Sequence, residues 1–175
     1  EKALTIKPSD SGARIRKAAI ALVVNNDQKY SEKLLQELYA DSNMGKIPSH
    51  EEQCDIRTFL GLLEEKKSNN QSAIGFFNQA LALKPTHAYL YYNIGRVLFK
   101  KKQYNAALEY FRNAQKLSPR FTGAVLYEGL SLIELSRFSK AYEVFVAAMM
   151  QNANVREFHV LGAYTAFKSG NREAG

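Results

Sequence analysis

The side chains that could take part in catalysis or metal binding are few and scattered along the chain. His50 and Cys54 lie four residues apart, which would place two zinc ligands on one face of a helix, but they have no obvious companions. Cys54 could instead be a nucleophile if a histidine lies close to it in space. Ser131, in EGLSLIEL, has only one of the two glycines of a hydrolase nucleophile motif. We therefore expect no catalytic residues, no metal site, no cofactor and no enzymatic activity.

The composition is that of an ordinary globular protein. Of the 175 residues, 46% are hydrophobic and 23% are charged, and the formal net charge is +7. Apolar runs stay well short of the roughly 18 residues that a membrane-spanning helix needs. The single cysteine excludes an internal disulfide framework. The opening EKALTIKPSD lacks the pattern of a signal peptide, which leaves a cleaved signal open. The compartment is not determined by the sequence, and a cytoplasmic location is favoured.

Proline spacing predicts a repeated structural unit, which would have to position any functional side chain. Three of the four prolines close a similar phrase, which reads EKALTIKP at 1–8, NQALALKP at 78–85 and RNAQKLSP at 112–119. The spacing of Pro85 and Pro119 sets a period of 34. A constant period of this length is typical of solenoids, in which each unit buries its apolar face against the next.

Three units of equal length, 54–87, 88–121 and 122–155, agree in phase. Each is interpreted as two amphipathic helices, because apolar residues recur at intervals of three and four. The first helices are predicted over 54–67, 88–101 and 122–135, and the second over 70–84, 104–117 and 138–151. Small residues, a phenylalanine and a terminal proline recur at fixed positions: Gly61, Gly95 and Gly129; Ala73, Ala107 and Ala141; Phe77, Phe111 and Phe145; Ala80, Ala114 and Ala148; and Pro85 and Pro119, with Ala153 in the third unit.

The pattern L-G-x-x-Y, then A-x-x-x-F-x-x-A, then P, at period 34, resembles the tetratricopeptide repeat. Residues 88–121 match it nearly throughout, with Tyr91 at the family's usual tryptophan position. The other units depart from the pattern at Arg57, Glu64, Glu128 and Ala153. The resemblance implies an all-α, right-handed solenoid of helix-turn-helix repeats. In such arrays the first helices line a concave surface and the second helices form the outer face.

The rest of the chain fits the same array. Residues 1–10 are expected to end a preceding repeat, 14–47 to form a degenerate repeat, and 155–175 to start a further one. We therefore predict a single array over 1–175, with one irregular loop around NMGKIPSHEE. The chain is interpreted as a slice of a longer array.

The predicted binding site is the concave surface of the first helices. Positions 2, 5, 9 and 12 of such a helix share one face. Apolar and aromatic walls with a few polar groups suit an extended peptide or a short amphipathic helix, because aromatic rings provide contact area and Asn93 and Arg96 could bond a peptide backbone or carboxylate. The alternative is that several of these side chains only pack against neighbouring helices. The predicted groove residues are Leu62, Tyr89, Tyr92, Asn93, Arg96, Lys100, Leu126, Tyr127 and Leu130.

A subgroup of the family grips a C-terminal carboxylate with lysine, asparagine and arginine side chains on successive first helices. Of the corresponding positions in this chain, only Asn93 matches. A clamp for chaperone tails is therefore not expected. The apolar groove is more similar to repeats that hold secretion or pilus-assembly clients.

Charge is concentrated in the unit 88–121, which has seven basic residues against the single acid Glu109. The Lys100–Lys102 run follows a helix rich in Tyr and Phe, which could indicate nucleic acid. Lysines at a helix C-terminus are, however, favoured by the helix dipole, so nucleic acid is not expected. An acidic protein or peptide partner is the stronger expectation.

We thus expect a protein–protein interaction scaffold or adaptor, one region of a larger protein in a multiprotein assembly. One alternative is a chaperone or assembly factor for a secretion or pilus system. A second is self-assembly into a homo-oligomer, because repeats with open ends could stack between chains. A targeting module of an enzyme is the least favoured.

Overall fold

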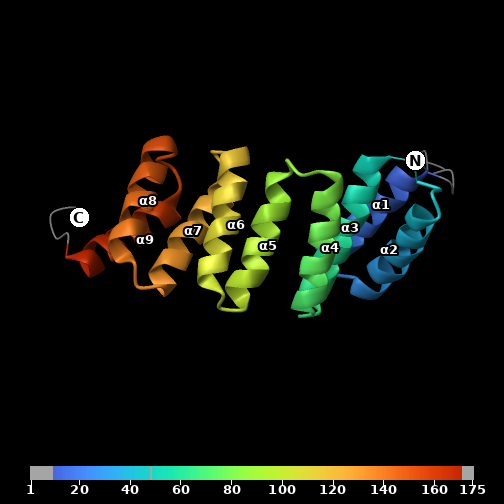
Figure 1. Cartoon of the computed structure of the whole chain (residues 1–175), viewed down its shortest axis with the longest axis horizontal. Coiled ribbons are helices and arrows are strands. Elements are labelled where there is room, and N and C mark those ends of the chain that lie inside the picture. The colour runs from blue at the N-terminus through green and yellow to red at the C-terminus, as the bar shows by residue number, and fades with distance from the viewer. Residues whose placement is uncertain (1–9, 48, 171–175) are drawn as a thin grey trace. The chain divides into compact units, whose positions relative to one another are not determined.

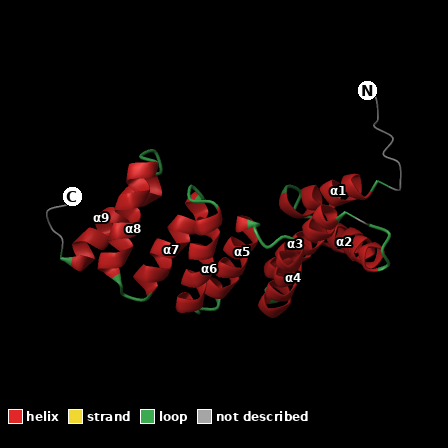
Figure 2. Cartoon of the chain, turned by 45° about the horizontal axis from the view of Figure 1, so that its top comes forward, coloured by secondary structure: helices red, strands yellow, loops and turns green. Residues whose placement is uncertain are grey.

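The computed structural model describes residues 10–47 and 49–170, and every regular element in these ranges is an α-helix (Figures 1 and 2). The chain divides into two compact units, Glu1–Pro85 and Thr86–Gly175, and each is described by itself. The helices of the first unit are α1 (Ser11–Val23), α2 (Gln28–Asn43), α3 (His50–Lys66) and α4 (Asn70–Leu83). Those of the second unit are α5 (Ala88–Lys100), α6 (Tyr104–Leu117), α7 (Thr122–Glu134), α8 (Phe138–Gln151) and α9 (Arg156–Ser169).

The predicted all-α fold of helix-turn-helix repeats is confirmed. The largest difference at a predicted helix boundary is at α3, which begins at His50 rather than at Cys54. The side chain of Ser49 caps this helix by accepting a hydrogen bond from the backbone N–H of Glu52 at 3.3 Å. Glu51 and Glu52 then lie in the first turn, where carboxylates stabilise the positive end of the helix dipole.

The turns within the repeats share one backbone conformation. Ser68, Lys102 and Ser136, which occupy the same position in three successive repeats, all have a positive φ, between 56° and 64°. In each case the next residue donates its backbone N–H to a carbonyl of the preceding helix, as Gln103 does to Leu98 at 2.9 Å. This left-handed residue ends the first helix and reverses the chain.

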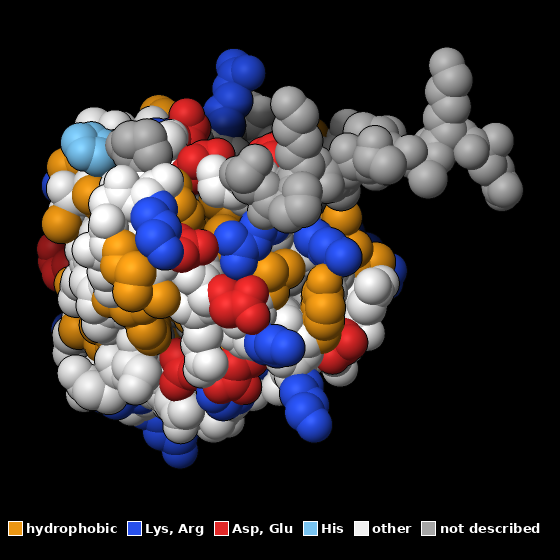
Figure 3. Space-filling model, turned by 90° about the vertical axis from the view of Figure 1, so that its right-hand side faces the viewer, with side chains coloured by type: hydrophobic (Ala, Val, Ile, Leu, Met, Phe, Trp, Pro, Cys, Tyr) orange, Lys and Arg blue, Asp and Glu red, His pale blue; other side chains and the backbone are white. Residues whose placement is uncertain are grey.

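Within the first unit, α1, α2 and α3 pack around a common core whose most buried members include Leu22, Leu35 and Ile56. Ion pairs cover its surface, among them Arg14 with Asp41 at 3.1 Å and Lys67 with Glu32 at 2.9 Å. Figure 3, which faces α1 and α2, shows acidic and basic side chains interspersed over this surface.

Within the second unit, α7 packs against α5, α6, α8 and α9. Its core includes Leu132, Phe145 and Phe158. Parts of the two predicted terminal repeats, residues 1–9 and 171–175, lie outside the described residues. The joining of all repeats into one array over 1–175 stays a prediction.

Candidate partner-binding surface

Eight of the nine predicted groove residues lie on two helices of the second unit, α5 and α7, which pack against each other. Leu62 is the ninth. It lies on α3 of the first unit, half-buried against that unit's core. The candidate surface described below is therefore the face formed by α5 and α7, and we call it the α5/α7 face.

Tyr92 is the centre of an aromatic cluster that joins α5 to α7. Its ring centroid lies 4.8 Å from that of Phe121, 5.8 Å from that of Tyr127 and 6.2 Å from that of Phe111. A Cβ atom at Gly123 would lie 3.2 Å from the Tyr92 ring, so the first turn of α7 fits closely against it. Aromatic pairs at such distances contribute beyond the area they bury. Tyr92 therefore holds the two helices together, and only part of its ring reaches solvent.

Tyr89, one turn before Tyr92, is more exposed, with 39% of its surface accessible. Its ring is stacked on Phe121 with centroids 6.4 Å apart and lies 6.0 Å from the Tyr92 ring. Phe121 was not predicted as part of the surface. It ends the unit 88–121, and the only signal for it was an aromatic residue directly before a first helix.

Asn93 has the least ordinary environment on this face. Its side chain is fully buried, and Oδ1 accepts a hydrogen bond from Arg96 Nη1 at 3.3 Å. Its Nδ2 group, in contrast, finds no acceptor among the described residues. A buried donor without a partner costs about 1–3 kcal/mol, and such donors are rare in native proteins.

Arg96 and Lys100 follow Asn93 along α5. The Arg96 guanidinium lies 5.6 Å from the centroid of the Tyr92 ring, a cation–π geometry, and its side chain is half-buried. Lys100 is the last residue of α5 and is exposed. The α5/α7 face thus has two cations beside its aromatic cluster.

The α7 side of the face is mainly apolar. Leu126 and Leu130 are half-buried, and Leu126 packs against the core of the second unit. The Tyr127 ring lies between those of Phe99 and Phe111, with centroids 5.4 Å and 5.5 Å away. These side chains both support the fold and border the surface.

The second unit carries nearly all of the net charge. Residues 86–175 contain twelve Lys and Arg against six Asp and Glu, a net charge of +6, which leaves +1 for residues 1–85. Exposed cations at its helix-joining turns, such as Lys101, Lys102 and Arg137, form no ion pair within the part of the chain that the structure describes. The unit therefore carries a net positive electrostatic potential.

His50 and Cys54, which were considered for metal binding and nucleophilic catalysis, both lie on α3. Within the described ranges, no three His, Cys, Asp or Glu side chains could share a metal ion. The Cys54 side chain is buried, and this burial raises the pKa of its thiol. A buried thiol with a raised pKa is a poor nucleophile. Among the described helices, none is long and apolar enough to cross a membrane.

Comparison with known proteins agrees with the geometry. The family model for the tetratricopeptide repeat matches residues 88–121. These residues therefore form a tetratricopeptide repeat. The chain is similar to the BBSome complex member BBS4 homolog of Drosophila melanogaster, which is 24% identical over 165 residues, covering 93% of this chain and 32% of the relative. The chain spans only 5% of two further tetratricopeptide repeat relatives, from mouse and human.

Two solved structures illustrate the shared tetratricopeptide fold. One is pilF of Pseudomonas aeruginosa, with a TM-score of 0.77, 20% identity and coverage of 94% of this chain and 72% of that one. The other is YrrB, described as a TPR protein with an unusual peptide-binding site, with a TM-score of 0.71, 22% identity and coverage of 94% and 80%. At these identities the similarity establishes the fold alone. The family and the fold together support a protein–protein interaction scaffold.

Proposed function

We propose that this chain is a scaffold or adaptor that holds a segment of a protein partner on the α5/α7 face. The partner segment is an extended peptide or a short amphipathic helix. Tyr89 and the exposed parts of Tyr92 and Leu130 provide apolar contact area for it. Aromatic side chains of this kind contribute a large share of the binding energy at protein interfaces.

The observation that carries the proposal is the unpaired Nδ2 group of Asn93. A backbone or side-chain carbonyl of the partner would supply the acceptor that this donor lacks. Because Asn93 is fully buried in the free chain, the neighbouring side chains, including half-buried Arg96, must rotate to admit the partner. Rotamer changes of this size are common when interfaces form.

The net charge of +6 on residues 86–175 favours an acidic partner. Long-range attraction of this kind mainly accelerates association and weakens with added salt. The relative from Drosophila is named as a member of a complex, and YrrB is described as having a peptide-binding site. Both descriptions agree with a role as one part of a multiprotein assembly.

Self-association is a second candidate, because α9 exposes several large apolar side chains. Val160 is 58% exposed, Tyr164 43% and Phe167 70%. These residues share one face of the helix by their spacing of three and four. Analytical ultracentrifugation over a range of protein concentrations tests this candidate, which requires a mass that rises with concentration.

The proposal is tested by affinity capture from the source cell followed by mass spectrometry. The chain is compared with two variants, Tyr89→Glu on the α5/α7 face and Tyr164→Glu on α9, whose tyrosines are similarly exposed. A partner that is lost only with Tyr89→Glu supports the proposal, because the added negative charge repels an acidic segment. If both variants capture the partner as well as the unsubstituted chain does, the proposal is contradicted. If the partner is lost only with Tyr164→Glu, binding is assigned to α9.

A further inference from the structure

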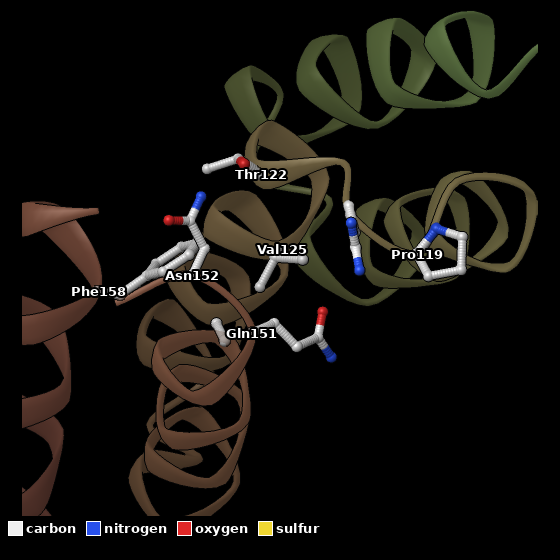
Figure 4. A pocket seen from close by; sticks show the side chains of 8 residues that line it. Pro119, Thr122, Val125, Gln151, Asn152 and Phe158 are labelled. Carbon is white, nitrogen blue, oxygen red and sulfur yellow. The ribbon is translucent and has the colours of Figure 1, made fainter. Parts of the chain in front are cut away.

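A hollow of about 240 Å³ lies in the second unit, and none of its lining residues is among those predicted for the α5/α7 face. It is formed by the turn between α6 and α7, the start of α7, the end of α8 and the start of α9. Its apolar lining consists of Pro119, Val125, Ala148 and Phe158. Figure 4 shows Val125 in the middle of the hollow, with Phe158 to one side and Pro119 to the other. Pockets for drug-sized ligands start at about 300 Å³, so this hollow has room for a single side chain.

Comparison with the preceding repeat shows where a smaller side chain lines the hollow. Val125 has the same position in its repeat as Tyr91 in the preceding one, and Val144 has the same position as Tyr110. In the unit 88–121 these two tyrosine rings face each other, with centroids 6.3 Å apart. In the next unit Val144 packs against the core, whereas Val125 lines the hollow, and its smaller side chain leaves more space there than a tyrosine would.

The rim of the hollow is polar and favours a negative group. It is formed by Arg120, Thr122, Gln151 and Asn152. Arg120 is exposed and forms no ion pair with the described residues. α7 starts at Thr122, and its N-cap residue Phe121 supplies no side-chain hydrogen bond, so the positive end of the α7 dipole lies at the same rim. An arginine at a helix N-terminus, beside two amides, is complementary to a carboxylate.

We propose that this hollow binds an aromatic side chain of a partner protein whose neighbouring carboxylate is held by Arg120. The ring replaces the contacts that Tyr91 makes in the preceding repeat and packs on Val125, Ala148 and Phe158. The carboxylate lies at the rim, where Gln151 and Asn152 can donate hydrogen bonds. The site is separate from the α5/α7 face and does not depend on the function proposed for that face.

The test is a titration of the ¹⁵N-labelled chain, followed by NMR, with 3-phenylpropanoate. Its matched probe is 3-phenylpropanamide, which has the same ring and no charge. We expect saturable shifts of amide signals from Thr122, Val125 and Phe158, with affinity about tenfold lower for the amide. The absence of saturable shifts at these residues with the carboxylate would overturn the proposal.

Two variants separate the ring from the carboxylate. Val125→Tyr fills the hollow as Tyr91 does and is expected to abolish binding of both probes while the chain stays folded. Arg120→Gln keeps the hollow and is expected to weaken binding of the carboxylate about tenfold, with no effect on the amide. Arg137→Gln, at an exposed turn of the same unit, is the control and should change neither. If Arg120→Gln binds both probes as before, the assignment of the carboxylate to Arg120 is wrong, whatever Val125→Tyr does.

Two peptides identify the source of the carboxylate. N-acetylphenylalanine represents an aromatic residue at a C-terminus, and N-acetyl-Phe-Asp-amide represents one followed by an acidic residue within a chain. If one of the two peptides binds more tightly than the other, and Arg120→Gln weakens its binding, the proposal is supported. The tighter peptide then represents the source of the carboxylate. Failure of both to shift the signals of Val125 and Phe158 contradicts it.

Discussion

Gly95 and Phe111 are in such close contact that a Cβ atom on Gly95 would lie 2.6 Å from Cε1 of the phenylalanine ring. Phe111 is fully buried, so its ring cannot move aside easily. The same contact joins Gly61 to Phe77 and Gly129 to Phe145. In these three repeats, then, the absence of a side chain on the first helix allows an aromatic ring of the second helix to pack against its backbone.

Substitution of Gly95 by alanine is therefore expected to destabilise the fold by about 1–3 kcal/mol, the usual effect of overpacking a filled core. The control is Gly75→Ala on α4, where nothing lies within 4 Å of the added Cβ atom. Gly75→Ala should stabilise the chain by about 0.5–1 kcal/mol, because alanine has the higher helix propensity. Urea unfolding measures both. If Gly95→Ala is as stable as the unsubstituted chain, the close-contact position assigned to Gly95 within the repeat is wrong.

Glu128 is a buried acid at a position where the other two repeats have Leu60 and Ile94. Its carboxylate accepts hydrogen bonds from Arg112 Nε at 2.8 Å and from Gln115 Nε2 at 2.7 Å, both on α6. Arg112→Ala should cost about 1–3 kcal/mol of stability, because it leaves a buried carboxylate with one partner fewer. Thermal unfolding should show this as a fall in Tm of about 2–4 °C per kcal/mol.

The same pair allows a double-mutant cycle. Glu128→Leu restores the residue type of the other repeats and should be close to neutral, because Arg112 is half exposed and can turn to solvent. Adding Glu128→Leu to Arg112→Ala should then recover most of the lost stability. Strictly additive effects of the two substitutions would show that the ion pair contributes nothing to the packing of α6 on α7.

Asp41 makes the stability of the first unit depend on pH. Hydrogen bonds from Arg14 and Lys46 lower the pKa of its carboxyl group below the ordinary value of 3.8. A group whose pKa is lowered by folding stabilises the fold above its ordinary pKa, and this contribution disappears as the pH falls through the lowered value. Asp41→Asn should therefore lower Tm at neutral pH, and the difference in Tm from the unsubstituted chain should shrink as the pH falls below 3.8 and through the lowered pKa. A difference in Tm that stays constant with pH would contradict a stabilising role for the ionised Asp41 carboxylate.

The sequence predicted the repeat architecture well because the repeating residues have a local cause. Periodic apolar residues, the Gly–Phe contacts and the turn residues at Ser68, Lys102 and Ser136 each act within a single repeat. Departures from that local pattern were harder to interpret. The early start of α3 depends on capping by Ser49, which lies before the expected repeat.

The candidate surface was predicted less completely, because helix periodicity shows which residues share a face but not how deeply each is buried. Tyr92 is expected as a binding residue, and its ring also joins α5 to α7, so a Tyr92→Ala variant would disturb the fold as well as partner binding. The unpaired Nδ2 group of Asn93 depends on neighbours from several turns, and no sequence pattern indicates it. The hollow beside Val125 could have been found by comparing Val125 with Tyr91.

If Asn93 keeps a buried amide donor for a partner, the substitution Asn93→Leu should separate partner binding from stability. Leucine has a similar shape and no unpaired donor, so the variant should be as stable as the unsubstituted chain or more so in urea unfolding. Its affinity for the captured partner segment, measured by isothermal titration calorimetry, should fall about tenfold or more. Unchanged affinity together with reduced stability would contradict the account, because Asn93 would then serve only the fold.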